Sequence, residues 1–476
     1  MTTSTGKSSM HRNTRGRRDA RNFLITAGLA LVLAGCTDTI DSIVEVTPRD
    51  QIDPEALGTA AGATALYNGA IDRFSIGFSG NNGGQEGIAI IGGTMADEWF
   101  HSGTFSTRFT YDQRQETSDN GTVGGALRNM HTARVAALRA YTALLATGST
   151  AAADSRVGEM RALEAFGFIL GAETFCSGLP FSEVEGTEIV YGDPLTSDQA
   201  NEKAIERLDE ALAGAAGPGG TIANLARVLK ARALMNLGKN RFSEAASVVA
   251  SVPDGFQYFA FHSTQGNRNG IFVFNTQNER FSLAHNEGTN GLPFRGAGDG
   301  TDETTADPRI PWTRTAGGTD VGFDNNDPQY DAQKWLTFED DVVVASGIEA
   351  RLIEAEALLN SGGDWLGKLN ALRATVTGLA PLADPGNAAA REDLVFSEKA
   401  FWLFGEGHRL GDMRRLLRQY SRAENTVFPI GPYHEGGVYG TDVTFPIHVQ
   451  ELNNPLYKAA ETGGQLNLRG CFSDNP

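Results

Sequence analysis

The sequence is poor in cysteine, histidine and basic residues. Its 476 residues include 3 Cys and 8 His, with 58 Asp and Glu against 40 Lys and Arg, which gives a net charge of −18. No CxxC pair or histidine cluster has the spacing of a metal site, so we expect no metal and no cofactor. The negative charge also disfavours binding to phosphate backbones. Nucleic acid is therefore not an expected partner.

Long apolar runs are also scarce, and the one near the N-terminus is too short to span a bilayer. It starts at Phe23, follows five arginines between positions 12 and 21, and ends in Leu31-Val32-Leu33-Ala34-Gly35-Cys36. A basic stretch, a short apolar run and small residues before a cysteine are typical of a lipoprotein leader. A short buried core helix is the alternative. We predict that residues 1–35 are a signal peptide and that Cys36 carries lipid.

Cleavage before Cys36 would remove six basic residues and one acidic residue, which leaves a charge near −23. Residues 36–56 are polar, and Pro48 and Pro54 break any helix there, so we expect a tether. The whole chain is 40% hydrophobic, and its remainder, residues 57–476, is long enough to bury a large core. We expect it to be a single domain held at a membrane by acyl chains.

Two cysteines, Cys176 and Cys471, remain in the mature chain. In an oxidising compartment such residues either pair or stay buried apart, and sequence alone does not decide between the two. A disulfide across so long a loop would constrain the unfolded chain, and it would pin the C-terminal tail. We therefore predict a disulfide between them.

Apolar residues recur at helical spacing over most of the chain, which predicts a mainly α fold. The sharpest pattern spans residues 231–245, where small residues, Leu237-Gly238, the aromatic Phe242 and Glu244-Ala245 follow one another as in a tetratricopeptide repeat. A weaker copy spans residues 350–359. Simple two-helix hairpins are the alternative for each copy. We expect helical repeats at about 125–252 and 345–418.

Helical periodicity is lost at about 254–340, between the two repeat regions. This segment is rich in Gly, Asn and Asp, and it carries an aromatic ring every several residues. A loop-rich insertion this long in a compact domain is usually functional. We predict that it forms the ligand-recognition face. Residues 88–109, rich in glycine and aromatic side chains, are interpreted as an ordered loop.

Trp99 is the aromatic residue that best suits a sugar site. It follows Asp97 and Glu98 in a glycine-rich stretch, where an indole can stack on a sugar while carboxylates accept its hydroxyl hydrogens. The alternative is that Trp99 fills the core beneath the loops. Trp312 and Trp335 carry the same ambiguity. Together they predict an aromatic platform.

Three polar residues complete the predicted ligand site: Asn81, Asn82 and Arg309. The alternative for Arg309 is a structural pairing with Asp307. The acidic run at 324–331 offers carboxylate oxygens to Ca²⁺, but it lacks the spacing of an EF-hand, and Pro328 suits a plain turn. We interpret that run as a solvated loop.

Glu406 and His408 lie two residues apart, which invites a catalytic interpretation as an acid/base pair. Arg409 and Asp412 follow at i+3 and i+4 spacings, so each anion would have a donor on one helix face. No nucleophile or metal set accompanies them. We expect a structural network here and no enzymatic activity.

Five motifs lie in the order found in the SusD/RagB family of outer-membrane nutrient-binding lipoproteins. They are Asp307-Pro308-Arg309, the repeat copy at 350–359, Leu369-Asn370-Ala371-Leu372-Arg373, Glu406-Gly407-His408-Arg409 with Asp412, Met413 and Arg414, and Phe445-Pro446-Ile447 leading to Asn454-Pro455. With the lipobox, the chain resembles this family over nearly its whole length. The helix at 127–144 departs from the family pattern, with Met130, His131 and Arg139 where the family often has Trp, Tyr and Asn.

The resemblance implies a tetratricopeptide-like helical body with a loop-rich ligand face. Family members sit as a lid over a TonB-dependent, SusC-like transporter and deliver oligosaccharides, or in some members peptides, into it. We therefore expect a lipoprotein on the outside of the outer membrane, with such a transporter and an oligosaccharide or peptide as partners. A glycosidase, which needs two carboxylates across a cleft, and a scaffold for envelope assembly are the alternatives.

Overall fold

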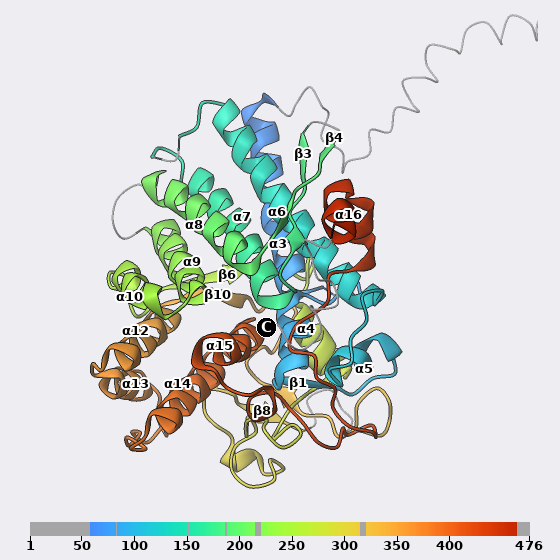
Figure 1. Cartoon of the computed structure of the whole chain (residues 1–476), viewed down its shortest axis with the longest axis vertical. Helices are drawn as coiled ribbons and strands as arrows, with labels where there is room; N and C mark the ends of the chain where they lie inside the picture. Colours follow the sequence, from blue (N-terminus) through green and yellow to red (C-terminus); the bar gives the residue numbers. More distant parts are fainter. Residues whose placement is uncertain are drawn as a thin grey trace, which may run out of the picture. The chain divides into compact units, whose positions relative to one another are not determined.

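Helices form most of the protein in the computed structural model (Figure 1), which confirms the mainly α fold class. All described residues belong to one compact unit, residues 56–476. They are residues 58–81, 83–150, 152–185, 188–214, 220–314 and 320–463. The predicted signal peptide, Cys36 and the tether lie outside the described residues.

The first half of the body is a stack of helices in which neighbours along the chain pack together. Its members are α3 (Ala60–Ser79), α6 (Gly121–Ala146), α7 (Ser155–Thr174), α8 (Ser197–Gly214), α9 (Thr221–Leu237) and α10 (Phe242–Val249). Helix α3 packs on α6, and each helix from α6 to α10 contacts the next. Small side chains such as Ala231 and Ala233, both fully buried, let these helices approach closely.

The turn after α9 has the features of the repeat pattern. Gly238 ends α9 with φ +120°, a region of backbone space that favours glycine. One 3₁₀ turn, η2 (Lys239–Arg241), follows, and α10 begins at the buried Phe242. The second copy ends in the same manner, because Gly362 has φ +76° and donates its N–H to carbonyls in the last turn of the preceding helix.

The C-terminal part adds a second group of helices, shown in orange to red in Figure 1. They are α12 (Gly347–Ser361), α13 (Trp365–Arg373), α14 (Ala388–Trp402), α15 (Arg409–Tyr420) and α16 (Pro455–Thr462). Helix α12 packs on α10, α13 and α14, while α15 packs on α7 and on α4 (Ile88–Ala96). A small separate core that includes Leu352, Trp365 and Val395 joins α12, α13 and α14.

The strands are short and pair two by two, all antiparallel. The pairs are β1 (Trp99–His101) with β7 (Phe281–Leu283), β2 (Leu179–Pro180) with β5 (Pro194–Leu195), β3 (Glu183–Glu185) with β4 (Glu188–Val190), β6 (Gln257–Ala260) with β10 (Val342–Ser346), and β8 (Trp312–Thr313) with β9 (Asp331–Ala332). The β6–β10 pair closes the base of the predicted insertion. The β1–β7 pair then brings the insertion against the N-terminal part of the chain.

Short helical turns complete the insertion and the C-terminal segment. They are α11 (Gly270–Phe272), the π-helical η3 (Val273–Gln277), η4 (Glu303–Thr305), η5 (Glu424–Thr426) and η6 (Val449–Asn453). No helix in the described part of the chain combines the length and the apolar character needed to cross a membrane.

The interpretation of residues 88–109 as an ordered loop is wrong. The segment forms α4 (Ile88–Ala96), strand β1 and α5 (Ser106–Asp112). Every residue of α4 is buried, so the helix has no polar stripe and its sequence shows no amphipathic period. Its two glycines permit close packing, because a Cβ on Gly93 would lie 2.9 Å from Trp99 Cδ1. Burial on all sides therefore hid this helix from a periodicity argument.

Candidate functional site

The three predicted tryptophans lie in the core, so the predicted aromatic platform is wrong. Trp99, Trp312 and Trp335 are 1%, 4% and 4% exposed. The Trp99 ring packs 4.8 Å from that of Phe404. Gly405, with φ +69°, lies against two of the indoles, since a Cβ there would be 2.5 Å from Trp335 and 3.5 Å from Trp99. None of these rings offers a face to a ligand.

The carboxylates next to Trp99 are also buried and serve the fold. Both oxygens of Asp97 accept hydrogen bonds from the Arg409 guanidinium, at 2.6 and 2.8 Å. Glu98 Oε1 accepts the backbone N–H of Gly405 at 2.9 Å. Burial raises the pKa of Glu98 to about 8, so this side chain is mostly uncharged at pH 7. These two acids join α4 to the segment before α15 and cannot reach a ligand.

The predicted polar residues divide between core and surface. Arg309 makes a bidentate contact with Asp307, at 2.8 and 2.7 Å, and a further contact with Glu398, so its structural alternative is correct. Asn81 is partly exposed in a tight turn, where its Oδ1 accepts the N–H of Gly83 at 2.8 Å. Asn82 lies outside the described residues. Asn81 is thus the one described member of the predicted set at the surface.

The segment from Glu406 to Asp412 is a structural network, but its partners are not those expected. Glu406 contacts Lys334 at 2.6 Å, and Asp412 contacts Lys399 at 2.6 Å. His408 Nε2 lies 3.0 Å from Arg232 Nη1, and burial lowers its pKa well below the usual value. This nitrogen therefore accepts a hydrogen bond from the Arg232 guanidinium. These contacts connect the segment to residues far away in the sequence, whereas the expected pairs lay within the segment on one helix face.

A cavity of about 380 Å³ opens beside the Asn81 turn. Gln85 and Glu86 of that turn line it, together with Phe105 just before α5, Arg108 of α5 and the first turns of α6. The insertion contributes Phe274, Asn278 and Arg280. Elements from three separate parts of the chain thus converge on it. Residues of the insertion line this cavity, but they are not residues that the sequence singled out.

Phe105 is the exposed aromatic side chain of this cavity. Its ring is 51% exposed, and the Arg108 and Arg280 guanidinium carbons lie 4.6 and 5.0 Å from its centroid. Arg280 also stacks 4.0 Å from the half-exposed Phe323. Cation–π contacts of this kind hold the flat groups in place. The result is a rigid surface of alternating rings and guanidinium groups.

Polar groups of the cavity differ in how far the protein already satisfies them. Arg108 is paired with the buried Glu86, whose pKa burial raises above its usual value despite this pairing. Asn278 lines the cavity, and Arg280 Nη1 is a buried nitrogen without a hydrogen-bond partner in the described part of the chain. Both side chains can donate to a bound molecule.

The start of α6 lines the cavity with small residues, Gly121, Thr122, Gly125 and Ala126. Gly121 and Gly125 lie on the first turns of α6, and a Cβ added at either position would meet nothing within 4 Å. Gly84, on the other rim, is equally free of neighbours. A larger, more open groove of about 510 Å³ runs beside α8 and the end of α9, but its lining contains no aromatic side chain. The smaller cavity is thus the better candidate for ligand recognition.

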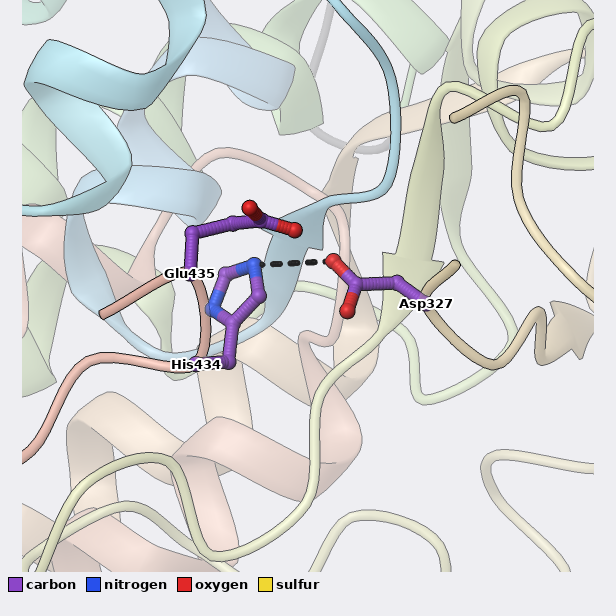
Figure 2. Close-up of side chains that lie close together, drawn as sticks. All are labelled: Asp327, His434 and Glu435. Atoms are coloured by element: carbon purple, nitrogen blue, oxygen red, sulfur yellow. Dashed lines mark ion pairs between the residues drawn. The ribbon is translucent and has the colours of Figure 1, made fainter. Parts of the chain in front are cut away.

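A second cluster of polar residues joins the insertion to the C-terminal segment (Figure 2). His434 Nε2 lies 3.2 Å from Asp327 Oδ2, and Glu435 points toward the same carboxylate. Asp112 and Glu287 each lie 3.9 Å from a His434 nitrogen. Partial burial lowers the pKa of His434, but its ion pair with Asp327 and the nearby carboxylates of Asp112 and Glu287 outweigh burial and raise the pKa to about 9.

The acidic run at 324–331 is not the solvated loop that was expected. Asp327 is 7% exposed and Asp331 is fully buried. Asp324 caps the turn by accepting the backbone N–H groups of Asn326 and Asp327, at 2.8 and 3.0 Å. No motif in the sequence links this turn to a histidine more than a hundred residues away.

The two predicted disulfide partners can be followed in part. Cys176 is 2% exposed and disulfide-bonded. Cys471 lies outside the described residues, so the pairing of the two stays a prediction.

Solved structures with a similar fold are SusD-like proteins. A SusD superfamily protein from Parabacteroides distasonis aligns with a TM-score of 0.62 and 14% identity, over 85% of this chain and 98% of its own length. Surface glycan-binding protein A from Bacteroides uniformis gives 0.59 and 16%, over 84% and 98%. A SusD-like carbohydrate binding protein from Bacteroides vulgatus gives 0.54 and 16%, over 74% and 82%. No protein-family model and no curated protein matches the sequence.

Proposed function

We propose that this chain, which has the fold of the SusD superfamily, binds an oligosaccharide in the cavity beside Phe105. The observation that carries the proposal is the exposed Phe105 ring, held between two guanidinium groups at the mouth of a cavity that is lined in part by glycines. Two of the similar solved structures are named as glycan- or carbohydrate-binding proteins, which supports the same ligand class.

The chemistry of the cavity suits a sugar ring. The apolar face of a pyranose can stack on Phe105, because an aromatic face attracts C–H groups and excludes water. Hydroxyl groups, or the carboxylate of an acidic sugar, can then accept hydrogen bonds from Asn278 and from Arg280, whose Nη1 has no hydrogen-bond partner among the described residues. Because Arg108 and Arg280 are fixed by stacking, little ordering cost accompanies binding.

A binding function without bond cleavage fits this lining. A glycosidase needs two carboxylates that flank the scissile bond. Among the described residues that line the cavity, Glu86 is the carboxylate, and it is paired with Arg108. We therefore propose a carrier and not an enzyme.

The cellular role that we propose is delivery of the bound glycan to a TonB-dependent outer-membrane transporter. The lipobox at Cys36 supports a lipid-anchored protein on the outer membrane, facing the cell exterior. Chemical cross-linking of intact cells followed by mass spectrometry tests the partner. We expect cross-links to a TonB-dependent barrel, and cross-links confined to periplasmic assembly factors would favour the scaffold alternative.

Calorimetry with a panel of neutral and acidic oligosaccharides and of peptides tests the ligand site. We expect Phe105→Ala to weaken binding at least tenfold, or about 1.4 kcal/mol, through loss of stacking. Phe261→Ala is the matched control, because Phe261 is also about half exposed but lies away from the cavity. Equal affinity in both variants would exclude Phe105 from the site. Binding to peptides alone would keep the site and change the ligand class.

A second variant blocks the cavity without removing any contact. Gly125→Phe places a ring in open space on a helix interior, where replacing glycine does not weaken the helix. Gly69→Phe on α3 is the matched control, since its Cβ also meets nothing within 4 Å but lies elsewhere. We expect binding to be lost in Gly125→Phe and kept in Gly69→Phe, with unchanged circular dichroism in both.

A further inference from the structure

Asp327, His434 and Glu435 form a group of possible metal ligands that joins two distant parts of the chain (Figure 2). One ligand atom from each lies within 4.8 Å of the other two. The Asp327 Oδ2 to His434 Nε2 distance of 3.2 Å is close to the spacing of roughly 3.4 Å between two ligands of a tetrahedral zinc ion. The donor atoms are therefore nearly in place for a single cation.

His434 is the basic partner of the acids around this group. Carboxylates of Asp112, Glu287 and Asp327 lie within 4.0 Å of the His434 ring nitrogens, and Glu435 is next to them. Among the described residues, no Lys or Arg forms an ion pair with any of these four acids. One imidazole thus faces four carboxyl side chains, and a cation bound among them would meet several oxygen ligands.

Asp327 gives a second, independent sign of a ligand. Its side chain is nine-tenths buried, and its Oδ2 receives no hydrogen bond with acceptable geometry although it points into the cluster. Buried carboxylate oxygens are normally satisfied by donors or by a metal. Asp324, another acid of the same loop, caps the turn, because its Oδ1 accepts the backbone N–H groups of Asn326 and Asp327. The turn therefore holds the Asp327 carboxylate in a fixed position.

The environment of the His434 ring matches that of a metal-bound imidazole. Nε2 faces Asp327, while Nδ1, on the other side of the ring, lies 3.9 Å from Glu287 Oε1. A carboxylate behind the second nitrogen is a common arrangement at zinc sites, because it orients the ring and raises the basicity of the ligating nitrogen. The Phe100 ring, 5.0 Å away and edge-on, restricts the imidazole further.

We propose that Asp327, His434 and Glu435 bind a zinc-type divalent cation that ties the insertion to the C-terminal segment. One imidazole with two carboxylates suits Zn²⁺, whereas Ca²⁺ and Mg²⁺ require oxygen ligands. Nε2 lies 3.2 Å from the carbonyl oxygen of His101, which can only accept, so this nitrogen carries a proton in the metal-free protein. The cation replaces that proton, which is released to solvent.

Calorimetric titration of the untagged, chelator-treated mature protein with ZnCl₂, MnCl₂, CaCl₂ and MgCl₂ tests the site. We expect one Zn²⁺ per chain, at least tenfold weaker binding of Ca²⁺ and Mg²⁺, and release of about one proton near neutral pH, measured in two buffers of different ionisation enthalpy. Absence of zinc binding at millimolar concentration would overturn the proposal. Equal affinity for Ca²⁺ and Zn²⁺ would overturn the assignment of the ion.

Variants assign the ligands. We expect Asp327→Asn to weaken Zn²⁺ binding at least a hundredfold and Glu435→Gln at least tenfold, with Asp384→Asn as an exposed control that leaves it unchanged. Because Glu435 is exposed, its variant remains informative if Asp327→Asn does not fold. Zinc should also raise the melting temperature of the wild type and of the control but not of the ligand variants. Wild-type zinc affinity in a folded Glu435→Gln, Asp327→Asn double variant would refute the assignment.

Discussion

Replacement of Trp99 distinguishes a core role from a ligand-binding role more clearly than any other substitution. Its ring is 1% exposed and packs against Phe404 and the backbone of Gly405, and its indole nitrogen makes no hydrogen bond. Trp99→Ala would remove a large buried ring and leave a cavity between α4 and the segment before α15. Substitutions of this kind cost about 3–5 kcal/mol of unfolding free energy. Small domains have about 5–15 kcal/mol in total, so the loss should be large.

Urea denaturation followed by circular dichroism measures this loss as a lower midpoint at an unchanged slope. Trp99→Phe is the graded control, because it keeps an aromatic ring in the same space and should lose less. We also expect the folded fraction of Trp99→Ala to bind glycan with wild-type affinity, since the ring faces no cavity. A variant with the wild-type urea midpoint and lost glycan binding would show that Trp99 serves the ligand, and would refute the core assignment.

Three further predictions concern charge, lipid and disulfide. Burial raises the folded-state pKa of Glu98 from 4.5 to about 8, so the folded state keeps this proton to a higher pH than the unfolded state does. The free energy of unfolding therefore falls as the pH rises between these two values, by roughly 3 kcal/mol up to pH 7. Glu98→Gln should remove this loss of stability, so the urea midpoint of the variant should exceed that of the wild type by an amount that grows from pH 4 to pH 8. A difference in midpoint that stays constant with pH would contradict the raised pKa of Glu98. Mass spectrometry of the native N-terminus should find lipid on Cys36 and no residues 1–35, and Cys36→Ser should leave the membrane fraction; a variant that stays wholly with membranes would refute the anchor. Thiol labelling of the denatured, unreduced protein should find Cys176 and Cys471 blocked, and two free thiols would exclude their pairing.

Sequence periodicity predicted the helical body because its helices are amphipathic. Helices α6 and α8 to α10 have one apolar face that packs and one polar face that does not, and this contrast is visible without coordinates. The turn at Gly238 was equally visible, since only a residue that tolerates positive φ ends a helix in that way. Helix periodicity and turn preferences were sufficient for these features because each depends on residues close together in the sequence.

The same reasoning failed for α4, for the tryptophans and for the ligand face. Helix α4 is buried on all sides and shows no period. An indole in a glycine-rich stretch can face either solvent or core, and Trp99 faces the core because β1 pairs with β7 and carries it inward. Phe105, which is exposed, lacked any motif that would mark it. The burial of a side chain depends on what lies above it, and sequence spacing does not report that.

The sequence by itself determined the helical class, the repeat turns and the likeness to one family, and it predicted a leader that ends before Cys36, because each depends on residues close together in the chain. Only the tertiary structure decided which side chains meet. Phe105 and Arg280 are 175 positions apart and stack at 5.0 Å, and Asp327 meets His434 across more than a hundred residues. Contacts of this kind form when distant segments pack on a common core, so their geometry is a property of the folded chain and not of any local pattern.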